Sequence, residues 1–288
     1  MESIERSWDL MKRSFAILQS DNELMLFPIA SAFSCLLVSA VILGVTGTLS
    51  STITTLASGN APPQVGVPAS FAVLCLYVAN YFVIVFFNLA LVGVASDRMI
   101  GGTGTLRDGL GLAWERRGKV LQWALLAATV GIILRIVEGR LSWLGRLIVR
   151  LVGAAWSLAA YFVVPVLAFE DLGPVDALKR SAHLFRENWG ENLAGGFSFG
   201  YICGLLALPG VILWFVAAGV LGAAGMFLGG VLVVAYFLVL AVVSAAVQGI
   251  FMAALYRYAT GHEVPPGFRP EHFSKAWHGQ SMEPRRPT

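Results

Sequence analysis

Four arginines in one short stretch of the chain are the residues best placed for chemistry. They share that stretch with a single acid, Glu138, and are Arg135, Arg140, Arg146 and Arg150. Arg146 and Arg150 are four residues apart, so they lie on the same face of a helix. Because a guanidinium can bind phosphate through two hydrogen bonds, the group is a candidate site for an anionic group such as a lipid headgroup. In the alternative interpretation, these side chains only anchor helix ends among lipid headgroups.

Two asparagines lie within an otherwise apolar stretch and form a second candidate site. Asn80 and Asn88 are eight residues apart, so on a helix they point within about 80° of each other. They would provide a polar lining for a pathway through a membrane. They would equally serve as hydrogen-bonding groups between neighbouring helices.

Three glycines spaced four residues apart form a third pattern, namely Gly196, Gly200 and Gly204, and Pro209 and Gly210 follow them. Small residues at this spacing allow a neighbouring helix to approach closely. A Pro-Gly pair favours a kink or a break. The pattern therefore predicts either helix packing or a broken helix that lines a transport site.

The remaining reactive residues do not form a recognisable site. Three of the histidines lie near the C-terminus at spacings that match no metal site, and the three cysteines lie far apart in apolar stretches: His262, His272, His278, Cys35, Cys75 and Cys203. No HExxH, GxSxG or P-loop pattern occurs. We therefore predict no catalytic residues, no metal, no cofactor and no enzymatic activity.

The composition shows what must position these residues. The chain has 288 residues, of which 57% are hydrophobic and 13% charged, with a mean hydropathy of +0.74. Soluble domains have about 25% charged residues. Two long tracts, 24–96 and 192–256, contain no Asp, Glu, Lys, Arg or His. This pattern indicates a bilayer-spanning protein, because a charge at the centre of a bilayer costs about 2.5–3.5 kcal/mol.

The small formal net charge of +3 and the absence of a basic stripe argue against nucleic-acid binding.

Six stretches are long enough to cross a bilayer as helices, which needs about 20 apolar residues each. They are 24–49, 69–95, 120–137, 147–169, 193–220 and 226–258. With this division, sixteen Lys and Arg residues fall on one side of the membrane and four on the other. Because basic residues concentrate in the cytoplasm, both termini are predicted to be cytoplasmic and the protein to lie in the inner (plasma) membrane.

The charged segments between the spans are predicted to form amphipathic helices at the membrane surface. Apolar residues recur every three or four positions over 4–18 and 175–189. Pro174 suits the first turn of the second of these helices. Capping-box pairs would open the following spans, namely Ser20 with Glu23 and Asn188 with Glu191.

The two amphipathic segments also resemble each other. Asp9, Lys12, Arg13 and Ser14 match Asp176, Lys179, Arg180 and Ser181 at a constant offset of 167. We therefore predict an all-α membrane protein of six transmembrane helices, arranged as three hairpins that each follow an interfacial helix. Its single domain covers 1–260, with pseudo-repeats of about 1–97, 98–170 and 171–260, and a cytoplasmic tail covers 261–288.

Several motifs resemble those of a family of uncharacterised prokaryotic six-span membrane proteins. The central motif includes Ala155-Trp156-Ser157, Phe162-Val163-Val164-Pro165, Ala177-Leu178-Lys179-Arg180-Ser181 and Trp189-Gly190-Glu191. The opening Arg6-Ser7-Trp8 and the closing Leu255-Tyr256-Arg257-Tyr258 fit too, so the resemblance extends over nearly the whole chain. It implies a polytopic inner-membrane protein and supplies no catalytic residues.

Two functions are compatible with these features. The first is a non-enzymatic membrane protein whose cytoplasmic interfacial helices organise the membrane or dock a partner. The alternative is a transporter or channel for a lipid or a small amphiphile, with Asn80, Asn88 and the arginines on its path. The expected partners are membrane lipids, and further copies of the chain or a cytoplasmic protein.

Overall fold

The described chain is helical and contains six helices that are long and apolar enough to cross a membrane, which confirms the predicted number of spans. The structure is a computed structural model, and it describes residues 22–45, 67–187 and 189–261 together with Phe15 and Leu18. This part of the chain contains helices, turns and short irregular stretches, and no strand. The predicted capping residues Ser20 and Asn188 fall outside the described residues, as do the first amphipathic segment apart from Phe15 and Leu18 and the C-terminal tail from residue 262 onward.

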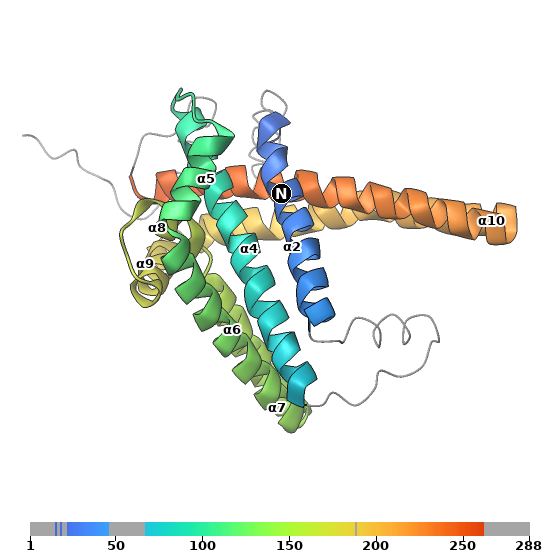
Figure 1. Cartoon of the computed structure of the whole chain (residues 1–288), viewed down its shortest axis with the longest axis horizontal. Coiled ribbons are helices and arrows are strands. Elements are labelled where there is room, and N and C mark those ends of the chain that lie inside the picture. Colours follow the sequence, from blue (N-terminus) through green and yellow to red (C-terminus); the bar gives the residue numbers. More distant parts are fainter. Residues whose placement is uncertain (1–14, 16–17, 19–21, 46–66, 188, 262–288) are drawn as a thin grey trace, which may run out of the picture. The chain divides into compact units, whose positions relative to one another are not determined.

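The chain divides into two compact units, of which the first covers Asp21–Phe185. Its long central helix, α4, contacts α2, α5, α6 and α8, and α6 also contacts α7 (Figure 1). The helices of this unit are η1 (Asn22–Met25), α2 (Leu26–Val45), α4 (Val67–Met99), α5 (Leu106–Glu115), α6 (Arg117–Arg140), α7 (Trp143–Ala159), α8 (Val163–Phe169) and α9 (Pro174–Glu187). The last two residues of α9 lie beyond the end of the unit.

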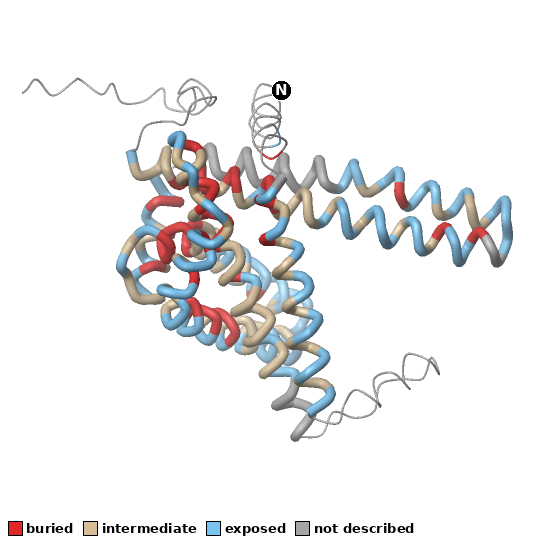
Figure 2. The backbone as a smooth tube through the Cα atoms, turned by 45° about the horizontal axis from the view of Figure 1, so that its top comes forward, coloured by how far each residue is buried: buried red, intermediate tan, exposed pale blue. Residues whose placement is uncertain are grey.

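The core of this unit lies along the second half of α4. Leu89, Ala90 and Leu91 are fully buried there, and the rings of Trp123 on α6 and Trp156 on α7 stack with centroids 5.9 Å apart. In contrast, apolar side chains along α2 and along α7 are exposed (Figure 2). Exposed apolar surface of this extent is expected where helices face lipid instead of water.

The second unit contains α10 (Trp189–Ala259), which consists of two helices that fold back on each other at Gly222. Gly222 has a φ of 59°, a conformation that glycine adopts without steric cost. The indole of Trp214 donates to the carbonyl of Met226 at 3.1 Å, and the hydroxyl of Tyr236 donates to the carbonyl of Leu206. Across most of 205–239 the side chains are exposed and apolar, as expected of lipid-facing helices.

The fourth predicted span is not one continuous helix, as the sequence analysis expected. It consists of α7 and α8, separated by a turn at 160–162. Pro165 lies in the first turn of α8, and proline can neither donate to the preceding turn nor fit beside its carbonyl groups. The Pro-Gly pair in the fifth span does not break the helix, since Gly222 is the residue of α10 with non-helical torsion angles.

Helix α9 begins at Pro174, as predicted, but its buried face is not the predicted apolar stripe. The buried residues are Ala177, Ser181, Leu184 and Phe185, whereas Val175 of the predicted stripe is 51% exposed. The buried face is therefore rotated so that it includes a serine. The reason is a hydrogen bond that Ser181 makes to the break in the fourth span, described below.

Candidate functional site

The polar residues of the first unit gather where α4 ends and α5 begins. The backbone N–H of Gly102 donates to the carbonyl of Asp97 at 3.0 Å, and the N–H of Gly104 donates to its carboxylate at 2.8 Å. A side chain at Gly102 would collide with that carboxylate. The glycines therefore allow the chain to wrap tightly around Asp97, the first charged residue after the long apolar tract.

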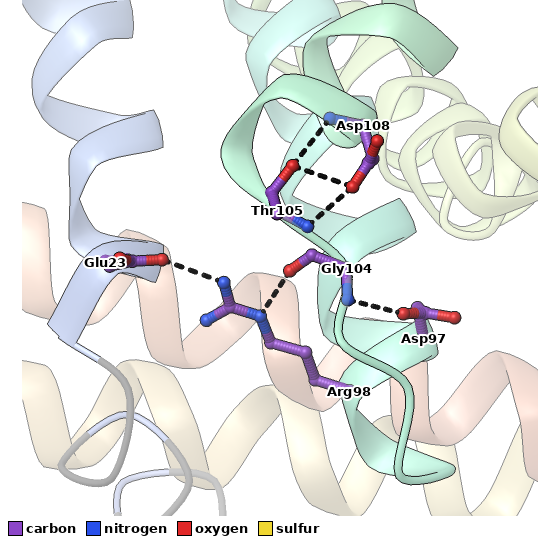
Figure 3. Close-up of polar contacts among 6 residues, drawn as sticks. All are labelled: Glu23, Asp97, Arg98, Gly104, Thr105 and Asp108. Atoms are coloured by element: carbon purple, nitrogen blue, oxygen red, sulfur yellow. Dashed lines mark hydrogen bonds and ion pairs between the residues drawn. The ribbon is translucent and has the colours of Figure 1, made fainter.

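Arg98 connects this turn to the start of the first span (Figure 3). Its Nε donates to the carbonyl of Gly104 at 2.7 Å, and its guanidinium pairs with the carboxylate of Glu23 at 2.9 Å. The arginine side chain is 17% exposed, and that of Glu23 is 62% exposed. Because one partner is in solvent, the ion pair itself contributes little stability, but it fixes the position of the guanidinium.

A capping box starts α5 directly after the turn (Figure 3). The hydroxyl of Thr105 accepts from the N–H of Asp108 at 3.3 Å, and the carboxylate of Asp108 accepts from the N–H of Thr105 at 2.8 Å. The hydrogen bonds from Thr105 lower the pKa of the Asp108 carboxyl below its ordinary value. The capping box therefore favours the ionised form of the carboxylate, which is the form that accepts from the N–H of Thr105.

An open cavity of about 560 Å³ lies between the end of α4, the turn and α5. Its lining includes the carboxylates of Asp97 and Asp108, together with Thr103 and the glycines of both helices. Neither asparagine of the second predicted site lines it, and none of the four arginines does. The cavity therefore does not join the predicted sites into one pathway.

A group of ion pairs, which we call the ion-pair clamp, holds the α8–α9 connection against the start of α6. Arg116 and Lys119 both pair with Asp171, and Nε of Arg180 donates to the two carboxylate oxygens of Glu170 at 3.0 and 3.2 Å. Lys119 and then Arg116 hold the pKa of Asp171 below its ordinary value. The two pairs of Asp171 join residues more than fifty positions apart in the sequence. The pair of Arg180 with Glu170 ties α9 to the same connection, so the clamp restricts how α9 can move.

The break in the fourth span is closed by a side chain from α9. The hydroxyl of Ser181 accepts from the N–H of Phe162 at 2.8 Å, and both residues are fully buried. Tyr161 packs edge-on against Phe162 and Phe185. The backbone donor that the break leaves without a helical partner is thus satisfied from α9.

One family profile matches residues 68–265 of this chain, about two thirds of its length. The chain belongs to the DUF6159 family, a family of unknown function. The DUF6159 match includes the turn after α4, the ion-pair clamp and the four arginines, whereas Glu23 lies outside it. The sequence analysis predicts a family resemblance over nearly the whole chain, and the profile supports a family match over residues 68–265. No curated protein and no solved structure matches the chain.

Within the DUF6159 match, the four predicted arginines lie around the turn between α6 and α7, and all four side chains are exposed. Nε of Arg150 pairs with Glu138 at 2.9 Å. Among the described residues, no acid lies within ion-pair distance of Arg135, Arg140 or Arg146.

The predicted asparagines are both half-buried on α4. The amide of Asn80 donates to the hydroxyl of Ser39 on α2 at 3.0 Å and to the carbonyl of Leu76 at 2.8 Å. Asn80 therefore joins two neighbouring helices. Asn88 lies two turns further along α4, nearer to the charged end.

The predicted glycines lie in the first part of α10. The surroundings of Gly196 and Gly200 are outside the described residues, and a side chain at Gly204 would meet open space. Close contact within α10 occurs instead at Gly210, where an added Cβ would lie 2.8 Å from the ring of Tyr236. Within the described residues, no group of three or more His, Cys, Asp or Glu side chains could hold a metal ion.

The sequence analysis did not identify the turn after α4, Ser181 or the ion-pair clamp as sites. One signal was available for the turn, since Asp97 and Arg98 end a long uncharged tract and precede Gly101, Gly102 and Gly104. The clamp gave no such signal, because its partners come from separate charged segments whose pairing depends on how the spans pack.

Proposed function

We propose that the chain is a non-enzymatic, multi-pass protein of the inner membrane that docks a cytoplasmic protein partner through its charged helices. In this proposal the six spans form three hairpins, each after an in-plane helix, and both termini are cytoplasmic. Helices α5 and α9 then lie on the cytoplasmic face, because the charged segments that contain them hold most of the basic residues between spans.

The observation that carries the proposal is the way α9 is held. The face that contains Ala177, Ser181, Leu184 and Phe185 is buried in the protein, so these side chains are not available to insert into lipid. Glu170 and Asp171, at the start of the connection to α9, are tied down by Arg180, Arg116 and Lys119. A helix fixed in this way presents its polar face in one orientation, which reduces the entropy lost when a partner binds.

A photocrosslinking amino acid on the exposed face of α9 tests this proposal in native membranes. We expect the reactive group at Val175 or Lys179, both exposed, to give one discrete protein adduct. The matched controls are Ile133 and Ile136, exposed apolar positions on α6, where we expect lipid adducts alone. Lipid adducts alone from both α9 positions would rule out a docked partner.

A transporter for a lipid or an amphiphile is the second candidate, favoured by the break between α7 and α8. Broken helices line the substrate sites of many transporters. Against this, the backbone N–H at Phe162 is already bonded to Ser181 and the residue is buried.

Vesicles that contain the purified protein and a fluorescent lipid separate the two functions. We expect no faster lipid exchange between leaflets than in empty vesicles, and faster exchange would favour the transporter.

A further inference from the structure

Within the described residues, the turn between α6 and α7 has an excess of positive charge that the acid beside it does not neutralise. The arginine patch, as we name it, consists of four exposed side chains, Arg135, Arg140, Arg146 and Arg150. Glu138 pairs with Arg150 and is the one acid between Arg135 and Arg150. Among the described residues, the four arginines and Glu138 together therefore carry a net charge of +3 that an external anion could balance.

The neighbours of the arginine patch indicate that it lies at the edge of the hydrocarbon. Trp143 is 71% exposed, and it is followed on α7 by further exposed apolar side chains, namely Leu144, Leu147, Ile148 and Leu151. Exposed tryptophans concentrate at the boundary between hydrocarbon and headgroups. The arginines thus lie where phosphate groups are the nearest anions.

The direction of α7 favours Arg146 and Arg150 as the binding pair. Side chains on a helix lean toward its N-terminus, and α7 begins at this turn. Arg150 is seven residues from Trp143, about 10 Å along the helix axis. Its Nε pairs with Glu138 in the last turn of α6, so its side chain extends back toward the turn. Helix α6 ends at this turn, so side chains on α6 lean away from the turn and toward the bilayer centre. Arg135 is therefore less well placed than Arg146 or Arg150 to reach a phosphate.

The arginine patch also opposes the usual distribution of charge. Basic residues on the non-cytoplasmic side work against membrane insertion in the predicted orientation, and an anionic lipid headgroup on that side would offset their charge. We infer that Arg146 and Arg150, assisted by Arg140, bind the phosphate of an anionic phospholipid in the non-cytoplasmic leaflet. The lipid's acyl chains lie along the exposed apolar side chains of α7.

Native mass spectrometry of the full-length protein with phosphatidylglycerol or phosphatidylcholine tests this site. We expect the wild type to retain phosphatidylglycerol in preference to phosphatidylcholine. Arg146→Gln with Arg150→Gln should lower phosphatidylglycerol retention about tenfold or more, since each removes hydrogen bonds to a charged group. Arg146→Lys with Arg150→Lys should lower it less, because lysine keeps the charge and loses the forked geometry. The control is Arg107→Gln with Lys179→Gln, two exposed cations elsewhere, which should leave retention unchanged.

Three results would overturn the assignment. The first is equal retention of both lipids by the wild type, and the second is unchanged retention by the glutamine pair. The third is displacement of the lipid by inorganic phosphate, which would show that the arginine patch takes the free anion. Because the lysine pair preserves the charge of the turn, it keeps the comparison valid if the glutamine pair fails to insert.

Discussion

The buried hydroxyl of Ser181 accepts a backbone hydrogen bond at the break in the fourth span. The turn at 160–162 interrupts the helical hydrogen bonds, and Ser181 supplies the acceptor that the N–H of Phe162 needs. A buried backbone donor without an acceptor costs about 1–3 kcal/mol. At the scale of the residue, the polar group in the face of α9 therefore has a structural reason.

We predict that Ser181→Ala lowers the free energy of unfolding by about 1–3 kcal/mol, because the N–H of Phe162 loses its acceptor. Thermal unfolding of the purified protein in detergent measures the change. Ser157→Ala is the control, since the hydroxyl of Ser157 is exposed and bonds within its own helix; its effect should stay within about 0.5 kcal/mol. Equal effects of the two substitutions would contradict the role given to Ser181.

Asp171 should make part of the stability depend on pH. Its pKa is lower in the folded protein than the ordinary 3.8 because of Lys119 and Arg116, so ionised Asp171 favours folding above that value. As the pH falls below 3.8 and through the folded pKa, the contribution disappears. Asp171→Asn should therefore unfold at a slightly lower temperature than the wild type at pH 7, because the exposed carboxylate contributes little, and the difference should vanish in strong acid. A constant difference at every pH would show that the clamp does not stabilise the fold through this charge.

At the scale of the element, α5 packs closely against α4 because Gly109 has no side chain to separate the two helices. A Cβ at Gly109 would lie 2.9 Å from the carbonyl of Ala90 and 3.0 Å from the ring of Phe27. Gly111, two residues later on the same helix, faces open space. The two glycines thus have different roles, although they look alike in the sequence.

We predict opposite effects of alanine at these two positions. Gly109→Ala should destabilise the protein by about 1–3 kcal/mol, because it forces α5 away from α4. Gly111→Ala should stabilise it by up to about 1 kcal/mol, because alanine favours the helix. Thermal unfolding of both variants gives the comparison. A destabilising Gly111→Ala would indicate that this side of α5 has a neighbour.

The sequence predicted the elements better than their contacts. Six spans, the start of α9 at Pro174 and the separation of the last two helices follow from apolar length and from proline and glycine, which act locally. The break before Pro165 was missed because the apolar run continues through it. The ion-pair clamp and the Ser181 hydrogen bond depend on which helices become neighbours, and no local pattern contains that information.

At the scale of the whole molecule, the distribution of charge determines the expected orientation. Charged residues are absent from 24–96 and 192–256 and gather in the segments that contain α5 and α9. If these segments face the cytoplasm, the arginine patch faces the opposite side. The docking proposal and the lipid proposal both depend on this arrangement, which makes it the central claim.

Cysteine accessibility in intact cells tests this claim most directly. In a chain whose Cys35, Cys75 and Cys203 are replaced by serine, single cysteines are placed at Gly111, Gly139 and Ser281; both glycines are exposed and face open space. We predict that a membrane-impermeant maleimide labels Gly139→Cys in intact cells. Gly111→Cys and Ser281→Cys should react only after the membrane is permeabilised. Labelling of Gly111→Cys in intact cells would contradict the account.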